Sequence, residues 1–184
     1  MNMNSNRYEE GWIFHTHAWE LLHEIIRIIN TTQERKTILD FGAGPGIAAS
    51  IIQTFFTDSR VYVTDIDESN IDVWSDRNLI GEVVDITSAL FNRFTLIPDH
   101  YDVIICSHVL EHVNNLRLTL SQLSCRAKTL ILVVPDGQVD DDSHKRIFDR
   151  VSFKKIIDST IDYTSISYYP LYHPHINNLV AVIQ

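Results

Sequence analysis

Basic side chains are scarce in this sequence, and their scarcity limits the partners it can bind. Lysine and arginine total 15 against 24 aspartates and glutamates, so the formal net charge of the 184 residues is −9. Nonspecific binding to nucleic acid needs cationic side chains that neutralise phosphates. We therefore do not expect nucleic acid as a partner, although a local basic patch is compatible with this balance.

Cysteines are few and long apolar runs are missing. The two cysteines match no metal-binding spacing, and we expect Cys106, inside an apolar run, to be a buried reduced thiol. No apolar run approaches the roughly 20 residues that span a bilayer. The polar start at residues 1–6 lacks the apolar core of a secretion signal. These absences predict a cytoplasmic protein with no membrane span.

Glycine and proline are also infrequent, at 6 and 5 residues, while 45% of the chain is hydrophobic. This composition is typical of an ordinary globular protein, and the length suits one domain. Apolar spacing predicts helices at 17–30, 46–56, 68–74, 113–123 and 149–158. It predicts strands at 37–41, 60–65, 81–85, 101–107, 129–134, 161–169 and 177–183. The alternation indicates a parallel sheet with helices on both faces, and the short last connection predicts an antiparallel final strand.

The glycines that are present concentrate in one turn. Residues 37–46 contain an apolar run that ends in an acid, followed by glycines at alternate positions. We expect a strand, a tight turn and a helix start, with backbone N–H groups of the turn free for a nucleotide-like ligand. A dinucleotide fingerprint would need a third glycine at position 47, and the chain has Ile47 there. This argues against a nicotinamide oxidoreductase.

Acidic residues end the first three predicted strands. Asp40, Asp65 and Asp85 would therefore gather at the carboxyl edge of the sheet, where open α/β sheets bind ligands. A carboxylate at Asp65 can accept both hydroxyls of a ribose, with Asp67 as the nearest competitor for that role. Each aspartate alone has a plain alternative as a turn or cap residue, but three in succession behind a glycine turn favour a site.

The pattern D-x-G-x-G-x-G at Asp40–Gly46 resembles motif I of the class I S-adenosylmethionine-dependent methyltransferases. Residues 101–113 resemble the fourth-strand region of the branch that includes ubiquinone-biosynthesis O-methyltransferases, and residues 143–153 resemble its region after strand five. The resemblance covers most of 37–158. It implies a doubly wound α/β fold with a mostly parallel seven-stranded sheet of order 3-2-1-4-5-7-6, an antiparallel last strand, and S-adenosylmethionine as cofactor.

The resemblance also implies roles for individual residues. It places Asp65 at the ribose, Ile66 and Asp85 at the adenine, and Ser107 and His108 beside the methionine part. The implied cofactor-binding residues are Asp40, Phe41, Gly42, Ala43, Gly44, Gly46, Asp65, Ile66, Asp85, Ile86, Ser107 and His108. Within a single domain of residues 1–184, it implies an N-terminal lid and helix at 1–30, a cofactor-binding core at 37–134, and an acceptor-side loop, helix and hairpin at 135–184.

Methyl transfer needs a base only when the nucleophile must lose a proton. Candidates for catalysis are His108, Glu111, His112 and His144, since histidine exchanges protons near neutral pH. We expect Glu111 and His112 in the first turn of a helix, where Glu111 would favour the helix dipole. A packed, hydrogen-bonded side chain is the alternative for His112.

The same residues raise the alternative of a metal site. Small-RNA 2′-O-methyltransferases also resemble this region and carry an acid at the position of His108, so the replacement leads us to expect no bound metal. If an ion bound, nitrogen donors would suit zinc, iron or cobalt better than magnesium.

The sequence therefore predicts a methyltransferase that moves a methyl group from S-adenosylmethionine to a small-molecule acceptor, with oxygen favoured as the acceptor atom. Two alternatives remain: a non-catalytic S-adenosylmethionine-binding module, and a metal-assisted RNA 2′-O-methyltransferase. The sequence does not identify the acceptor or the oligomeric state.

Overall fold

The computed structural model of the chain describes residues 16–30, 36–85, 88, 93–137, 142–171 and 177–184. Within these residues one seven-stranded sheet has the order β3-β2-β1-β4-β5-β7-β6. Its strands are β1 (Thr37–Phe41), β2 (Arg60–Asp65), β3 (Ile80–Val83), β4 (Tyr101–Ser107), β5 (Ala127–Pro135), β6 (Ile166–Leu171) and β7 (Asn178–Ile183). The pairs among β1 to β5 are parallel, whereas β7 runs antiparallel to both β5 and β6. The predicted fold class and strand order are confirmed.

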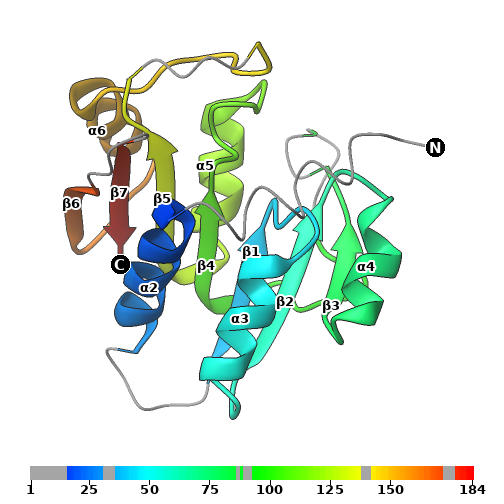
Figure 1. The fold of residues 1–184 in the computed structure, drawn as a ribbon. Helices are drawn as coiled ribbons and strands as arrows, with labels where there is room; N and C mark the ends of the chain where they lie inside the picture. The colour runs from blue at the N-terminus through cyan, green and yellow to red at the C-terminus, as the bar shows by residue number, and fades with distance from the viewer. Residues whose placement is uncertain (1–15, 31–35, 86–87, 89–92, 138–141, 172–176) are drawn as a thin grey trace.

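Helices cover both faces of this sheet (Figure 1). They are α2 (Thr16–Ile29), α3 (Ile47–Phe55), α4 (Asn70–Asp76), α5 (Leu116–Ser124) and α6 (Arg150–Asp158). The core on one face packs residues of α2, α3 and α4 against the sheet, and the core on the other packs residues of α5 and α6. None of the helices in the described part of the chain is long and apolar enough to cross a membrane.

The centre of the sheet follows directly from the apolar run in β4. Residues 103–106 are all buried, and Cys106 is a free thiol, as predicted. β4 pairs with β1 on one edge and with β5 on the other, and its side chains alternate between the cores on the two faces of the sheet. A nearly continuous apolar run is what such a strand needs. Pro170 lies in β6 at the sheet edge, where a missing N–H is tolerated.

Several element boundaries differ from the predictions. The sixth strand, predicted at 161–169, is observed at Ile166–Leu171, and the helix predicted at 68–74 is observed at Asn70–Asp76. The helix predicted from residue 113 begins at Leu116, because the side chain of Asn115 accepts a hydrogen bond from Leu118 N at 3.2 Å and caps it there. The third strand ends at Val83 instead of residue 85. The fifth strand runs from residue 127 and includes Pro135, paired with β7. Much of the predicted lid, residues 1–15, lies outside the described residues.

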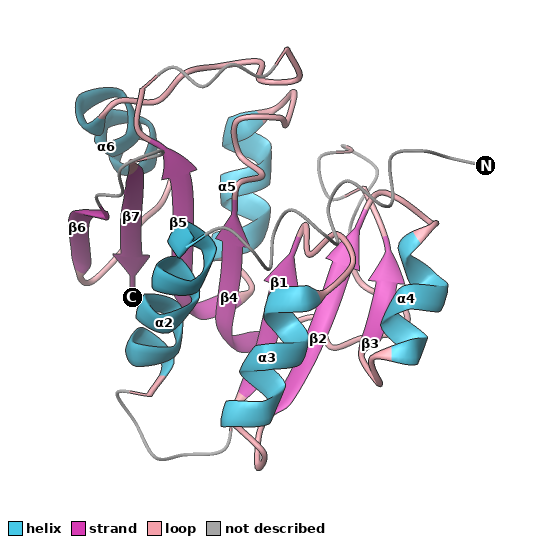
Figure 2. Ribbon diagram, viewed as in Figure 1, coloured by secondary structure: helices cyan, strands magenta, loops and turns pink. Residues whose placement is uncertain are grey.

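These elements direct one set of loops to a single edge. In Figure 2 the arrowheads of β1, β2, β4 and β5 point the same way, and the loops that follow β1, β4 and β5 gather there. This carboxyl edge carries the predicted site residues that the structure describes, and it positions the candidate site.

Candidate functional site at the carboxyl edge of the sheet

The glycine turn after β1 is held by hydrogen bonds to the end of β2. The carbonyl of Thr64 accepts from Gly42 N at 2.8 Å and from Ala43 N at 2.9 Å, and Asp65 Oδ2 accepts from Gly44 N at 2.8 Å. Gly46 N donates to Ala43 O. The prediction of free N–H groups in this turn is therefore wrong, because the neighbouring strand β2 supplies acceptors for them.

Two glycines of the turn show why side chains are excluded. Gly42 has φ of +72°, and a Cβ there would come 2.3 Å from Val109 Cγ2. This close approach packs the turn against the loop that follows β4. Gly44 has φ of +52°, yet a Cβ there would meet none of the described residues within 4 Å. Within the described part of the chain, the main chain at Gly44 therefore borders open space, where a ligand can reach it. This arrangement fits a nucleoside cofactor beside the turn.

Asp65, the last residue of β2, holds the glycine turn by a hydrogen bond and lies beside the main chain of Gly44. Besides Gly44 N, its carboxylate accepts from Asp67 N at 3.0 Å. Ile66, the next residue, has 69% of its surface exposed, so its apolar side chain is open to a ring. Asp67 lies farther out on the loop, and its own carboxylate accepts from Ser69 N at 2.9 Å. The geometry thus suits Asp65 better than Asp67 as the ribose acid.

Asp40 is a buried acid beneath this turn. It is the second-last residue of β1, since the strand continues to Phe41, whose side chain is buried. Burial, together with the nearby charge of Asp65, raises the pKa of Asp40 to about 7, although a hydrogen bond from Ala49 N opposes the shift. A cationic group brought near the turn would favour the ionised form of Asp40.

The adenine residues predicted from the third strand are only partly supported. Asp85 is exposed and lies beyond the end of β3 at Val83, so it does not end the strand as predicted. Its backbone oxygen accepts from Ser88 N at 3.1 Å. Ile86 lies outside the described residues. Asp85 stays a candidate because Val84 N donates to Asp65 O at 2.9 Å and holds this segment beside β2.

The end of β4 makes a sharp turn at His108. Ser107 is the last strand residue, and His108 has a φ of +56°, uncommon for a residue with a side chain. His108 N donates to Val133 O of β5 at 3.0 Å. Glu111 and His112 follow in an irregular turn, because α5 begins only at Leu116. The prediction that they form the first turn of a helix is wrong.

The four predicted catalytic residues come together at this turn. The side chain of Glu111 is 1% exposed, and its Oε1 lies 3.5 Å from His108 Nδ1. The rings of His112 and His144 meet edge to face with centroids 4.7 Å apart. Donor atoms of Glu111, His112 and His144 all lie within 4.8 Å of one another. The structure therefore joins two segments that are distant in sequence into one cluster of imidazoles around a buried carboxylate.

Hydrogen bonds between backbone and side chains join those segments. Lys145 N donates to Glu111 O at 2.9 Å. The Arg146 guanidinium donates to Leu110 O, and to Asn114 O at 3.3 Å. Arg146 was not among the residues predicted for the site, because nothing in the local sequence indicates these contacts. Burial lowers the pKa of Arg146, while the nearby charge of Glu111 opposes that shift.

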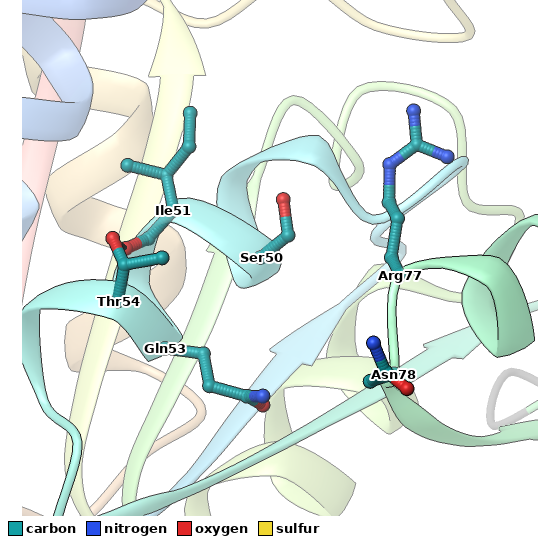
Figure 3. A pocket seen from close by; sticks show the side chains of 6 residues that line it. All are labelled: Ser50, Ile51, Gln53, Thr54, Arg77 and Asn78. Carbon is teal, nitrogen blue, oxygen red and sulfur yellow. Dashed lines mark hydrogen bonds between the residues drawn. The ribbon is translucent and has the colours of Figure 1, made fainter.

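Surface pockets elsewhere do not coincide with the predicted site. Figure 3 shows one of about 360 Å³ between α3 and the turn after α4. Its lining residues are Ser50, Ile51, Gln53, Thr54, Arg77 and Asn78. None of them belongs to the residues predicted for cofactor or catalysis.

The sheet order, the glycine turn and the acid that ends β2 together define the class of S-adenosylmethionine-dependent methyltransferases. A family model described as a methyltransferase domain matches residues 13–177. The chain belongs to this methyltransferase-domain family, and S-adenosylmethionine is its cofactor. No curated protein matches the chain in sequence.

Solved structures share the fold at low sequence identity. A SAM-dependent methyltransferase from Archaeoglobus fulgidus is 13% identical with a TM-score of 0.72, over 98% of this chain and 100% of that one. The 1,6-didemethyltoxoflavin-N1-methyltransferase of Burkholderia thailandensis is 13% identical with a TM-score of 0.72, over 97% and 82%. The CMeT domain of citrinin polyketide synthase is 16% identical with a TM-score of 0.74; the match covers 97% of this chain but 55% of that one.

Proposed function

We propose that this methyltransferase transfers the methyl group to an oxygen atom of a small-molecule acceptor. The observation that carries the proposal is the cluster of imidazoles at the carboxyl end of β4. A hydroxyl nucleophile must lose its proton during transfer, and imidazole is the side chain that ordinarily exchanges protons near neutral pH. His108 is our candidate for the group that takes the proton, because it directly follows the last residue of β4.

S-Adenosylmethionine, when bound, supplies the methyl group on a positively charged sulfur. Our proposal assigns the ribose hydroxyls to Asp65 and the adenine to Ile66 and the segment at Asp85. The open side of the Gly44 main chain, the exposed Ile66 side chain and the Asp65 carboxylate support this assignment. Ser107 and His108 would border the methionine part. The contribution of these residues is alignment of the two reactants and exclusion of water.

Two observations support a small acceptor. The net charge of −9 disfavours a nucleic acid, whose phosphates repel an acidic surface. The related structure from Burkholderia thailandensis contains bound 1,6-didemethyltoxoflavin, a small molecule. That protein is named an N1-methyltransferase, so the preference for oxygen rests on the imidazole cluster alone.

The test uses S-adenosylmethionine with a deuterated methyl group, incubated with the purified chain and with separate small-molecule, RNA and protein fractions of a cell extract. We expect label in a small molecule, and fragmentation should locate it on oxygen. Label confined to RNA or protein would contradict the proposal. Binding of S-adenosylhomocysteine without any turnover would favour the non-catalytic binding module instead.

A matched pair of variants separates chemistry from binding. His108→Ala should lower the rate of methyl transfer at saturating cofactor by a larger factor than it weakens S-adenosylhomocysteine binding. His100→Ala is the control, because His100 is exposed at the opposite end of β4 and should change neither quantity. Equal rates for both variants would remove His108 from the proposed role.

A further inference from the structure

Glu111 is buried, and the described part of the chain does not supply the hydrogen bonds that a carboxylate needs. Its side chain is 1% exposed, and neither of its oxygens has a hydrogen-bond partner among the described residues. The hydrogen bonds of the nearby Arg146 guanidinium go to backbone oxygens of Leu110 and Asn114. An uncompensated buried charge is costly, and such groups in native proteins are paired or coordinate a metal. A cation bound among the neighbouring side chains would compensate this carboxylate.

The groups that surround this carboxylate are imidazoles. His112 and His144 each offer a donor atom within 4.8 Å of a Glu111 oxygen and of each other, and His108 Nδ1 lies 3.5 Å from Oε1. All four side chains extend from just two segments, the turn after β4 and the segment before α6. Imidazole nitrogen combined with one carboxylate oxygen is the donor set of transition-metal sites.

We propose that Glu111, His112 and His144 bind one divalent transition-metal ion, with the remaining coordination positions open to water or to an acceptor oxygen. Bonds of about 2.0–2.2 Å place the donors of a tetrahedral site about 3.3–3.6 Å apart. The observed separations of up to 4.8 Å shorten to that range by small rotations of the half-buried imidazoles. The sequence led us to expect no metal because His108 replaces an acid. In the folded chain, the buried carboxylate of Glu111 favours a bound cation instead.

The surroundings already orient the ligands. His112 Nδ1 lies 3.1 Å from Ser143 Oγ and 3.4 Å from Ser143 O, which leaves Nε2 as the coordinating atom. A metal-bound histidine ordinarily makes such a bond with its other ring nitrogen. The bond from Lys145 N to Glu111 O holds the two ligand-bearing segments together. The backbone hydrogen bond therefore already brings the two ligand-bearing segments together.

The donor set selects among metals. Zinc, cobalt and nickel favour imidazole, whereas magnesium and calcium favour all-oxygen ligands. An ion here would lie at the acceptor side of the sheet edge, where it could hold an acceptor oxygen and lower its pKa. That role rests on the proposed function, whereas binding of the ion does not.

The test is a titration of the full chain, stripped with a chelator, with Co²⁺ followed by visible absorption and with Zn²⁺ followed by calorimetry. We expect one ion per chain and the intense visible bands of four- or five-coordinate Co²⁺, with no binding of Mg²⁺ at the same concentrations. His144→Ala and Glu111→Gln should weaken Co²⁺ binding at least tenfold. His100→Ala, an exposed histidine at the far end of β4, is the matched control and should leave it unchanged.

Thermal unfolding with S-adenosylhomocysteine shows whether each variant is folded and keeps its cofactor site. His144→Ala changes a loop residue, so it provides a readout even if the buried Glu111→Gln variant unfolds. Absence of a stoichiometric ion in the parent chain, or equal Co²⁺ affinity in His144→Ala and His100→Ala, would overturn the metal site. Neither result would affect the proposed methyl transfer, which the labelling experiment measures separately.

Discussion

Replacement of Asp65 by alanine should weaken cofactor binding at least tenfold. In the structure this carboxylate accepts from Gly44 N and from Asp67 N. A carboxylate offers about four lone-pair positions, so two remain for the hydroxyls of a ribose. Asp65→Ala would remove those acceptors and also release the glycine turn that they border.

The magnitude follows from the hydrogen bonds lost. A hydrogen bond to a charged group contributes about 1.5–3 kcal/mol, and about 1.4 kcal/mol corresponds to a tenfold change in affinity. Loss of a single ribose bond therefore accounts for the lower bound, and loss of two predicts about a hundredfold or more. Asp65→Asn should fall between parent and Asp65→Ala, because the amide keeps one oxygen that can accept from Gly44 N but loses the charge.

Isothermal titration with S-adenosylhomocysteine measures this without turnover. Asp67→Ala is the matched control, since Asp67 is exposed and its carboxylate bonds only locally to Ser69 N among the contacts described; its affinity should stay within about twofold of the parent. Unchanged affinity in Asp65→Ala would refute the assignment. A larger loss in Asp67→Ala than in Asp65→Ala would make Asp67 the ribose acid.

Three further substitutions test the scaffold of the site by urea unfolding. The pKa of Asp40 is raised from 3.8 to about 7 in the folded chain, so the folded chain binds this proton more tightly than the unfolded chain does. The free energy of unfolding should therefore fall by on the order of 4 kcal/mol as the pH rises from about 4 to 7. Asp40→Asn should abolish this part of the pH dependence, and an unchanged pH slope would contradict the assignment. Gly42→Ala should cost about 2–4 kcal/mol through its positive φ and its contact with Val109, with partial rescue by Val109→Ala; an unshifted midpoint would argue against the close approach. Asn115→Ala should cost about 1 kcal/mol by removing the cap of α5, and no loss would mean the cap contributes nothing.

The strands were predictable where burial leaves a local pattern. β4 is buried on both faces, so its apolar run marks it without reference to any partner. The order of the seven strands came from the family resemblance, since periodicity carries no information on which strands pair. Helix starts were less predictable: Val113 continues the apolar spacing of α5, but the side chain that caps the helix belongs to Asn115.

The cluster around Glu111 could be suspected from sequence but not assembled. Nothing local in the sequence indicates that His144 meets His112, because the contact depends on bonds made elsewhere, from Lys145 N to Glu111 O and from Arg146 to Leu110 O. The backbone conformation of the turn after β4 also could not be predicted from the sequence. A φ of +56° at His108 is uncommon for a residue with a side chain, and no glycine marks the position.

The hydrogen bonds of the glycine turn, which the sequence did not predict, bear on which nucleotide cofactor this fold can bind. Glycines in a strand-to-helix turn suggest free N–H groups, yet Thr64 O and Asp65 at the end of β2 accept those of Gly42 and Gly44. A pyrophosphate would need such N–H groups for itself. S-Adenosylmethionine carries no phosphate. In our proposal its ribose hydroxyls bind a carboxylate, and the cofactor lies close to the main chain of the turn. A turn whose N–H groups are already bonded therefore disfavours a dinucleotide, and it agrees with our proposal that S-adenosylmethionine binds beside Gly44.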